Sequence, residues 1–357
     1  MALVTKISLY LAIICFFFGQ LFRVNFLNFS FPIFDIAILL LAFSNLFIQK
    51  ISFKKLHSSV IYFAFFSLLT LIINWFHTPF SYSSFFYWLR LNALLSFFVF
   101  PLQIDTKIDK FFQLILWADL IFAFIQYFFW PDFTYFSTFN WDPHLYRLLG
   151  TFFDPTFTGL IFLLFLLKIY FSQKNYFYLI PIYLGLALTY SRSSLLAFII
   201  VFTFIAIKKK NLKIFLIAFI ILVSTIVLLP RMPGEGTKLE RASSIKAKIA
   251  NYESGIKLFA SSPFIGLGYN NLPTVRPNKN SHANSGFDSS LLTIAITTGI
   301  IGLFLFSKIF ISSLSSASLY WQSLLLCVFI HSLFANSLLY PWILFFLIFE
   351  FKYHKSP

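Results

Sequence analysis

Apolar runs long enough to cross a lipid bilayer follow one another along almost the whole chain. Crossing roughly 30 Å of hydrocarbon takes about 20 residues of helix. We predict about twelve such segments, near residues 5–23, 31–48, 58–76, 84–101, 110–130, 155–173, 176–190, 192–207, 212–230, 288–310, 317–337 and 339–352. Lipid offers the backbone no hydrogen-bond partners, so only helices and closed barrels span it, and continuous apolar runs exclude a barrel. We therefore expect an all-α polytopic transmembrane bundle.

The composition agrees with a protein embedded in lipid. The chain is 59% apolar and only 11% charged, whereas soluble domains carry about a quarter of charged residues. Connections between the apolar runs are short except at 131–154 and 231–287, and we treat residues 1–357 as one integral membrane domain. Two runs that meet near Ser191 are short and can also be one broken hairpin.

Features at the start of the chain and the cysteines narrow the class further. The first apolar stretch, at 7–22, is too long for the apolar core of a signal peptide, so we expect it to remain as the first span. Cys15 and Cys327 lie inside predicted spans, and His and Cys do not cluster. We expect neither a disulfide framework nor a metal site.

Basic residues predict an orientation. The lysines at 208–210 belong in the cytoplasm by the positive-inside rule, and alternation then places both termini inside and the loops at 131–154 and 231–287 outside. All basic residues on the inner side are lysines. The arginines all lie outside or in the outer half, at Arg23, Arg90, Arg147, Arg192, Arg231, Arg241 and Arg276. Because a guanidinium binds phosphate bidentately, the split indicates either an outward site for a phosphorylated ligand or anchoring to lipid headgroups.

The long outer loop contains a helical pattern. Apolar residues recur at intervals of three and four, at Leu239, Ala242, Ile245, Ile249, Tyr252, Ile256 and Phe259. The other faces of this pattern carry Lys238, Arg241, Lys246, Lys248 and Lys257. Such a basic amphipathic helix is expected to lie on the outer membrane surface above the bundle. It either fills a large loop or contacts a ligand directly, and both interpretations remain open.

Several polar segments face the same side. The stretch 262–271 is rich in Pro and Gly and must turn sharply. His282 follows in a polar segment before the next span, where an imidazole stays hydrated and titratable near neutral pH. Arg192 lies in the hydroxyl-rich turn between two spans, and Arg147 precedes another span that begins at Asp154-Pro155. For Asp154 we favour capping of that helix over catalysis.

These segments resemble the bacterial O-antigen ligase and O-antigen polymerase superfamily. The resemblance rests on Arg-x-x-Gly-Thr-Phe-x-Asp-Pro-x-x-x-Gly at 147–159, Thr-x-Ser-Arg-Ser at 189–193, Leu-Phe-x-x-x-Pro-x-x-Gly-x-Gly-x-Asn at 258–270, and His-x-Asn at 282–284 with a following Gly-x-x-Gly helix. Their order and the large late outer loop also match. Asp154 departs from the family, where asparagine is common nearby, and the first 140 residues carry no motif that aligns.

The resemblance implies a glycosyltransferase of the bacterial inner membrane that needs neither metal nor cofactor and whose active site faces the periplasm. Such enzymes move a glycan from a polyprenyl pyrophosphate carrier to a sugar hydroxyl, on lipid A core for a ligase or on a growing glycan for a polymerase. Membrane lipids are the other partners, and no nucleic acid is expected. The single long late loop favours the ligase slightly.

The resemblance also implies roles for individual residues. His282 corresponds to the functional histidine of the outer loop, supported by Asn284 and Asp288. The pyrophosphate-binding residues are Arg192, Arg147, Arg241 and Arg276. Arg241 is the nearest match to a loop arginine typical of the family, and Lys248 occupies a comparable position.

A transporter or lipid flippase is the main alternative. Transport typically leaves ionisable residues deep in the spans, and the predicted spans contain Asp35, Arg90, Asp119, His331 and Glu350. Arg90 needs a partner that either Asp35 or Asp119 can supply. We favour structural pairing over transport because no inverted half-repeat is evident.

Overall fold

The chain folds into a helical bundle with one small hairpin. The computed structural model describes residues 3–26, 29–47, 55–78, 81–139, 141–172, 175–275, 286–314 and 317–351. The helices are α1 (Leu3–Phe18), α2 (Ile33–Leu46), α3 (Lys55–Trp75), α4 (Tyr82–Val99), α5 (Thr106–Phe129), α6 (Pro155–Ser172), α7 (Leu179–Leu188), α8 (Arg192–Lys208), α9 (Leu212–Leu228), α10 (Ser243–Ser261), α11 (Leu272–Val275), α12 (Ser290–Ser313), α13 (Leu319–Ser332) and α14 (Pro341–Glu350). Each predicted apolar run coincides with one helix, and α10 and α11 lie in the long loop.

Within the described residues, four helical segments are long and apolar enough to cross a membrane. They are Ser58–Trp75, Thr106–Phe129, Pro155–Ser172 and Ser290–Ser313. Further apolar helices of 10–17 residues accompany them. The all-α membrane fold is confirmed at this level, whereas the number of crossings and their orientation remain predictions.

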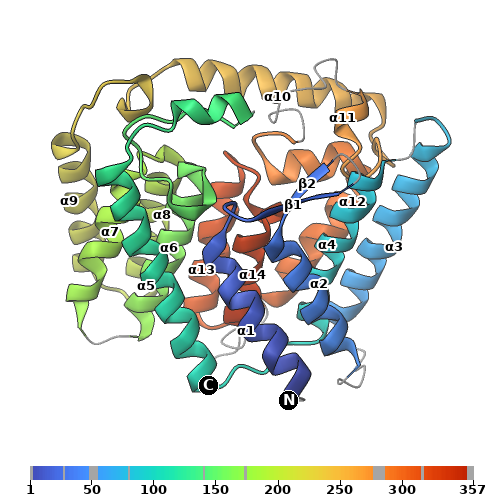
Figure 1. Cartoon of the computed structure of the whole chain (residues 1–357), viewed down its shortest axis with the longest axis horizontal. Coiled ribbons are helices and arrows are strands. Elements are labelled where there is room, and N and C mark those ends of the chain that lie inside the picture. Colours follow the sequence, from blue (N-terminus) through green and yellow to red (C-terminus); the bar gives the residue numbers. More distant parts are fainter. Residues whose placement is uncertain are drawn as a thin grey trace.

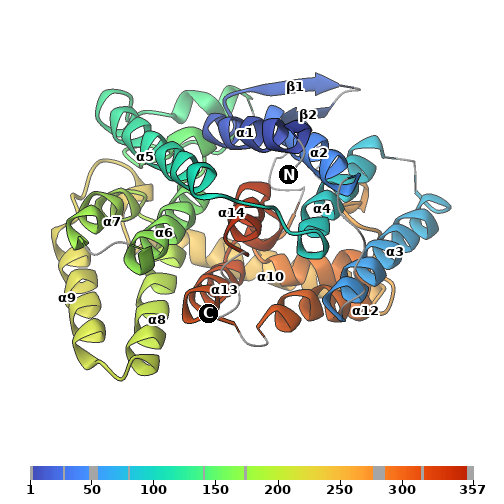
Figure 2. The same cartoon turned by 90° about the horizontal axis from the view of Figure 1, so that it is seen from below.

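Burial separates the helices into central and peripheral ones. Every residue of α14 is buried, and α14 stands in the middle of the bundle, with α3 and α9 toward opposite ends (Figure 2). A helix that is apolar on all sides is expected to lie in the core of a large protein. By contrast, α9 exposes Ile217, Ile220 and Val227 along its length, as a lipid-facing helix does.

A β-hairpin connects the helices of the first two predicted apolar runs. Its strands are β1 (Arg23–Phe26) and β2 (Phe29–Pro32), paired antiparallel with Arg23 opposite Pro32. Branched and aromatic side chains favour extended backbone, and the Arg23 guanidinium Nε donates to Ser30 Oγ at 2.9 Å across the pair. The hairpin is too small to change the fold class.

The predicted amphipathic helix is present as α10, which extends across the end of the bundle opposite the start of α1 (Figure 1). It begins at Ser243, so the first two residues of the predicted apolar face precede it. Among its own residues only Gly255 is buried, and Ile245, Ile249 and Ile256 remain about half exposed. The apolar face therefore stands away from the bundle instead of packing tightly against it.

The predicted turn at 262–271 fits into a break in α12. Gly299 has φ 66° and interrupts the helix. There the Leu267 amide donates to the Ile296 carbonyl at 2.9 Å, and the Ile300 amide donates to the Pro263 carbonyl at 2.8 Å. A side chain at position 299 would collide with the Phe264 carbonyl, so only glycine fits. This motif therefore anchors the end of α10 to α12.

Candidate active site

Two of the sequence motifs form one unit where α6 and α8 begin and α7 ends. The Arg147 Nε donates to the Thr189 carbonyl at 2.9 Å, and the Leu148 amide donates to the Leu188 carbonyl at 2.9 Å. Gly159 of α6 allows the close approach, because a Cβ there would lie 2.8 Å from Ser194 Oγ. Arg147 and Arg192 are thereby brought to the same place.

The third arginine reaches this unit from the long loop. Arg192, the first residue of α8, donates from Nη1 to the Arg241 carbonyl at 2.9 Å and from Nη2 to Ser244 Oγ at 2.5 Å. Arg241 in turn donates to the Gly236 carbonyl at 2.7 Å. The segment before α10 is held against the start of α8 by these bonds.

These residues surround a cavity of about 900 Å³, which we call the arginine cavity. Arg147, Arg192, Arg241 and Lys248 supply its basic groups. Hydroxyls line it as well, at Thr156, Ser191, Ser193 and Ser244. Its apolar wall comes from α10 and the end of α13, at Ile245, Ile249, Tyr252, Ile256, Leu333 and Phe334. The space between α10 and the rest of the bundle is thus basic on one wall and apolar on the other, with Glu253 as the acidic residue in its lining.

The three arginines of the cavity have no carboxylate partner within the described part of the chain. There, the arginines in ion pairs are Arg90 and Arg231. Arg147 is only 8% exposed, and burial together with the neighbouring charge of Arg241 lowers its pKa to about 9. It stays protonated at neutral pH. The charge of Asp154 acts in the opposite direction on the pKa of Arg147, and Glu253 also lines the cavity, but four basic groups face it, so an anion in the cavity would be favoured.

The N-terminus of α8 adds to this preference. Ser191 caps the helix, accepting a hydrogen bond from the Ser194 amide at 3.4 Å. Both Ser191 and Ser193 line the cavity, so the positive end of a 17-residue helix lies at its wall. Free amides and the helix dipole at such an end favour phosphate groups.

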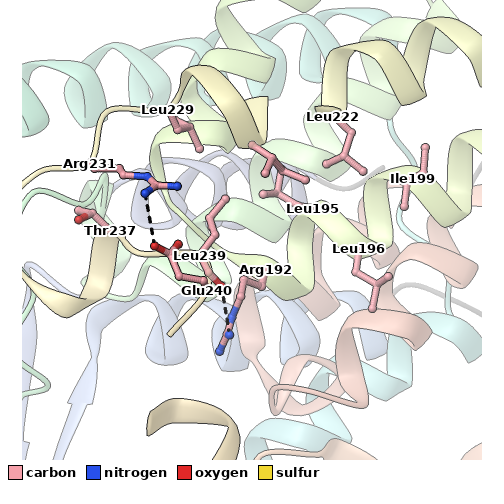
Figure 3. Close-up of a pocket in the computed structure, with 11 residues that line it drawn as sticks. Arg192, Leu195, Leu196, Ile199, Leu222, Leu229, Arg231, Thr237, Leu239 and Glu240 are labelled. Atoms are coloured by element: carbon pink, nitrogen blue, oxygen red, sulfur yellow. Dashed lines mark hydrogen bonds and ion pairs between the residues drawn. The ribbon is translucent and has the colours of Figure 1, made fainter. Parts of the chain in front are cut away.

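An apolar groove adjoins the arginine cavity. It has a volume of about 610 Å³ and lies between α8 and α9, lined mostly by aliphatic side chains, with the Arg231–Glu240 ion pair also in its lining (Figure 3). Leu195 and Ile199 come from α8, and Leu222 comes from α9. The groove shares Arg192 and Leu196 with the cavity. A ligand with a charged head and an apolar chain could therefore place its head in the arginine cavity and its chain in the adjoining groove.

Some of the predicted site residues lie together in the structure, and others do not. Arg147, Arg192 and Arg241 share the cavity. Lys248, predicted on a polar face of the amphipathic helix, lines the cavity beside Ile245 and Ile249 instead, and its Nζ is 3.1 Å from Asp288 Oδ1. Two partners hold Lys248 on the side of α10 that faces the bundle. One is the Asp288 carboxylate, and the other is the Phe334 carbonyl, to which Lys248 Nζ donates at 2.5 Å.

Two further predictions concern aspartates. Asp154 caps α6 as expected, because its Oδ1 accepts from the Thr156 amide at 2.7 Å. Asp288 was expected to support His282, and within the described residues its carboxylate contacts Lys248. His282, Asn284 and Arg276 lie outside the residues that the structure describes.

Sequence reasoning identified the hydroxyl-rich turn beside Arg192 but missed the contribution of α13. His331 was weighed only as an ionisable group within a span, yet it is fully buried directly behind Ser193. The sequence feature that could have indicated this contact is the run of hydroxyl residues at 189–194, because His331 contacts two of its serines, Ser193 and Ser194.

Comparison with known proteins addresses the same region. The family model described as O-antigen ligase matches residues 177–307, from the start of the α7 region into α12. No curated protein matches the chain. The matched region contains Arg192, Arg241 and Lys248, whereas Arg147 lies before it. The match indicates a membrane enzyme of the ligase or polymerase type, and it confirms that the chain resembles the O-antigen ligase and O-antigen polymerase superfamily.

Proposed function

We propose that this protein transfers a glycan from a polyprenyl pyrophosphate carrier to a sugar hydroxyl at the outer face of the bacterial inner membrane, with the pyrophosphate held in the arginine cavity. The observation that carries the proposal is the convergence of Arg147, Arg192 and Arg241 in one cavity with no carboxylate partner among the described residues. A doubly charged pyrophosphate supplies the missing counter-charge, and guanidinium groups bind it bidentately.

The apolar groove supports a lipid-linked donor over a soluble phosphate. Aliphatic side chains of α8 and α9 line it, and Arg192 stands between it and the cavity. A polyprenyl chain in the groove would keep the attached pyrophosphate beside Arg192. Burial of apolar surface contributes about 25 cal/mol per Å², so even a few isoprene units add substantially to binding.

In the proposed reaction the acceptor oxygen forms a bond to the anomeric carbon as the bond from that carbon to the pyrophosphate oxygen breaks. Pyrophosphate is a good leaving group, so the main requirements are positioning and stabilisation of its growing charge. The arginines and the N-terminus of α8 perform the second task. The acceptor proton must leave, and the resemblance assigns its removal to His282. Asp288, six residues after His282 in the sequence, contacts Lys248 at the cavity.

For the acceptor we propose lipid A core, which makes the enzyme a ligase. A repeat-unit polymerase would use the same cavity chemistry with a growing glycan as acceptor. Deletion in the native host separates the two: a ligase deletion leaves lipid A without polymer, whereas a polymerase deletion leaves single repeat units on lipid A.

Substitution of Arg192 tests the proposed donor site. Arg192→Gln removes the charge and should reduce transfer by at least about a hundredfold, because charge-assisted hydrogen bonds contribute about 1.5–3 kcal/mol each. Arg192→Lys keeps the charge without the bidentate geometry and should lose about tenfold. The matched control is Lys257→Gln, which removes an exposed charge of α10 that does not line the cavity. Transfer is measured with purified protein in vesicles. Equal donor binding by wild type and Arg192→Lys would refute bidentate binding of the pyrophosphate by Arg192.

A further inference from the structure

His331 is a buried histidine directly behind the arginine cavity. It lies at the end of α13 and is fully buried. Its Nε2 is 3.1 Å from Ser193 Oγ and 3.1 Å from Ser194 Oγ, and its Nδ1 is 2.6 Å from Ser337 Oγ. Of these serines, Ser193 lines the arginine cavity, next to Arg192. A hydrogen-bond path therefore leads from the core of the bundle to the cavity wall.

The partners of the ring decide which nitrogen carries the proton. Besides Nδ1, the acceptor for the Ser337 hydroxyl among the described residues is the Ala335 carbonyl at 3.5 Å, which is too long for a good bond. Ser337 therefore donates to Nδ1, and the proton of the neutral ring sits on Nε2.

The Nε2 proton leaves the Ser193 hydroxyl free to donate elsewhere. Ser194 has its own acceptor, the Thr156 carbonyl at 3.3 Å. Ser193 has Ser191 Oγ at 3.2 Å, a neutral acceptor on the cavity wall. A phosphate oxygen in the cavity would be a stronger acceptor than a hydroxyl, because bonds to an ionised acceptor are shorter and roughly twice as strong.

We propose that His331 is a positioning residue that makes the Ser193 hydroxyl a donor to a phosphate oxygen of the lipid-linked ligand. The inference rests on the proposed function. The chain of donors runs from Ser337 to His331, then to Ser193, then to the phosphate beside Arg192. Each bond polarises the next, so the effect on the ligand depends on the whole chain.

The surroundings hold this chain in place. Ser337 belongs to a short 3-10 turn, Ser337–Leu339, whose Leu338 amide donates to Ser290 Oγ at 2.9 Å. Ser193 lies in the first turn of α8, whose cap is Ser191. The ring is thus fixed between the start of α12 on one side and the start of α8 on the other. A group held by packing and hydrogen bonds on both sides loses little freedom when a ligand binds.

A double-mutant cycle tests the coupling. The probe is geranylgeranyl pyrophosphate, and its dissociation constant is measured on the full-length protein in lipid nanodiscs. His331→Phe keeps an aromatic ring without nitrogens, and Ser193→Ala removes the donor. Each should weaken binding about tenfold, since a hydrogen bond to a charged group contributes that much or more. The double variant should be no weaker than either single variant. The control variant Ser323→Ala removes a buried hydroxyl of α13 that does not contact His331 in the described structure, and it should bind the probe as wild type does.

Additive losses in the cycle, or normal binding by Ser193→Ala, would overturn the inference. If the losses in the cycle are not additive but Arg192→Gln binds the probe as wild type does, the proposed function itself is rejected. The two failures are therefore distinguishable. If His331→Phe does not fold, nitrogen NMR of the wild-type protein with labelled histidine decides. We expect a neutral ring protonated at Nε2, with the Nδ1 signal shifted by Ser337→Ala. A ring protonated at Nδ1 would contradict the proposal.

Discussion

The interior of the bundle pairs its basic side chains with carboxylates, whereas the three arginines of the arginine cavity have no ion pair among the described residues, and only the fourth basic group of the cavity, Lys248, has one, with Asp288. In the interior, Arg90 Nη1 is 2.9 Å from Asp35 Oδ2, so the partner is one of the two that the sequence suggested. Lys168 Nζ is likewise 2.6 Å from Glu350 Oε1 and 3.0 Å from Asp109 Oδ1. In the cavity, the described hydrogen-bond partners of Arg147, Arg192 and Arg241 are backbone carbonyls and a serine hydroxyl, and the carboxylate that lines the cavity, Glu253, forms no ion pair with them.

The difference separates stability from binding. Where both charges belong to the chain, removing one leaves the other uncompensated and the fold suffers. Where only the cations belong to the chain, the missing charge must come from a ligand, and the free protein carries the cost. Interior pairs also argue against transport, because ionisable groups that serve each other structurally need no moving ion to explain them.

The largest effect should follow from breaking an interior pair. Asp35→Asn leaves the buried Arg90 without a counter-charge and should lower the free energy of unfolding by about 3–5 kcal/mol. Unfolding of the purified protein in mixed detergent micelles measures the loss. The double variant Asp35→Leu with Arg90→Met replaces the pair by apolar groups and should recover most of the stability. A double variant as unstable as Asp35→Asn would show that the pair is not the cause.

The contrast also separates what the sequence could predict from what it could not. The helices were predictable because the bilayer fixes their length and demands apolar side chains, and each predicted run coincides with a helix. The arginine positions were predictable as motifs. Their convergence depends on contacts such as Arg192 to Ser244, across 52 residues, which no local pattern encodes.

Two residues show the limit in physical terms. Helical spacing placed Lys248 on a polar face, but an amphipathic pattern describes a helix on a flat surface, and α10 covers a basic cavity that has polar partners of its own. His331 meets Ser193 across 138 residues of sequence, so its role could not be inferred from its neighbours in the chain. In both cases the tertiary contact overrides the local pattern.

A smaller effect should appear when the missing charge is added to the cavity. Geranylgeranyl pyrophosphate at a hundred times its dissociation constant should stabilise the folded protein by about 2.7 kcal/mol, because it binds only the folded state. A thermal unfolding series in nanodiscs measures the shift. Geranylgeraniol, which has the same chain without phosphate, is the matched control and should give much less. Equal stabilisation by both compounds would place the binding energy in the apolar groove instead of the arginine cavity.

The smallest effect on stability should come from Arg147, although its effect on binding is large. Arg147→Met removes a buried cation whose pKa is lowered by burial and by Arg241, and it also removes the hydrogen bond to the Thr189 carbonyl at 2.9 Å. Relief of the uncompensated charge offsets the lost bond, which contributes only about 1 kcal/mol. The free energy of unfolding without ligand should therefore stay within about 1 kcal/mol of wild type, in contrast to Asp35→Asn, while stabilisation by the pyrophosphate is lost. A loss of about 3 kcal/mol or more without ligand would mean that Arg147, like Arg90, already has its counter-charge within the chain.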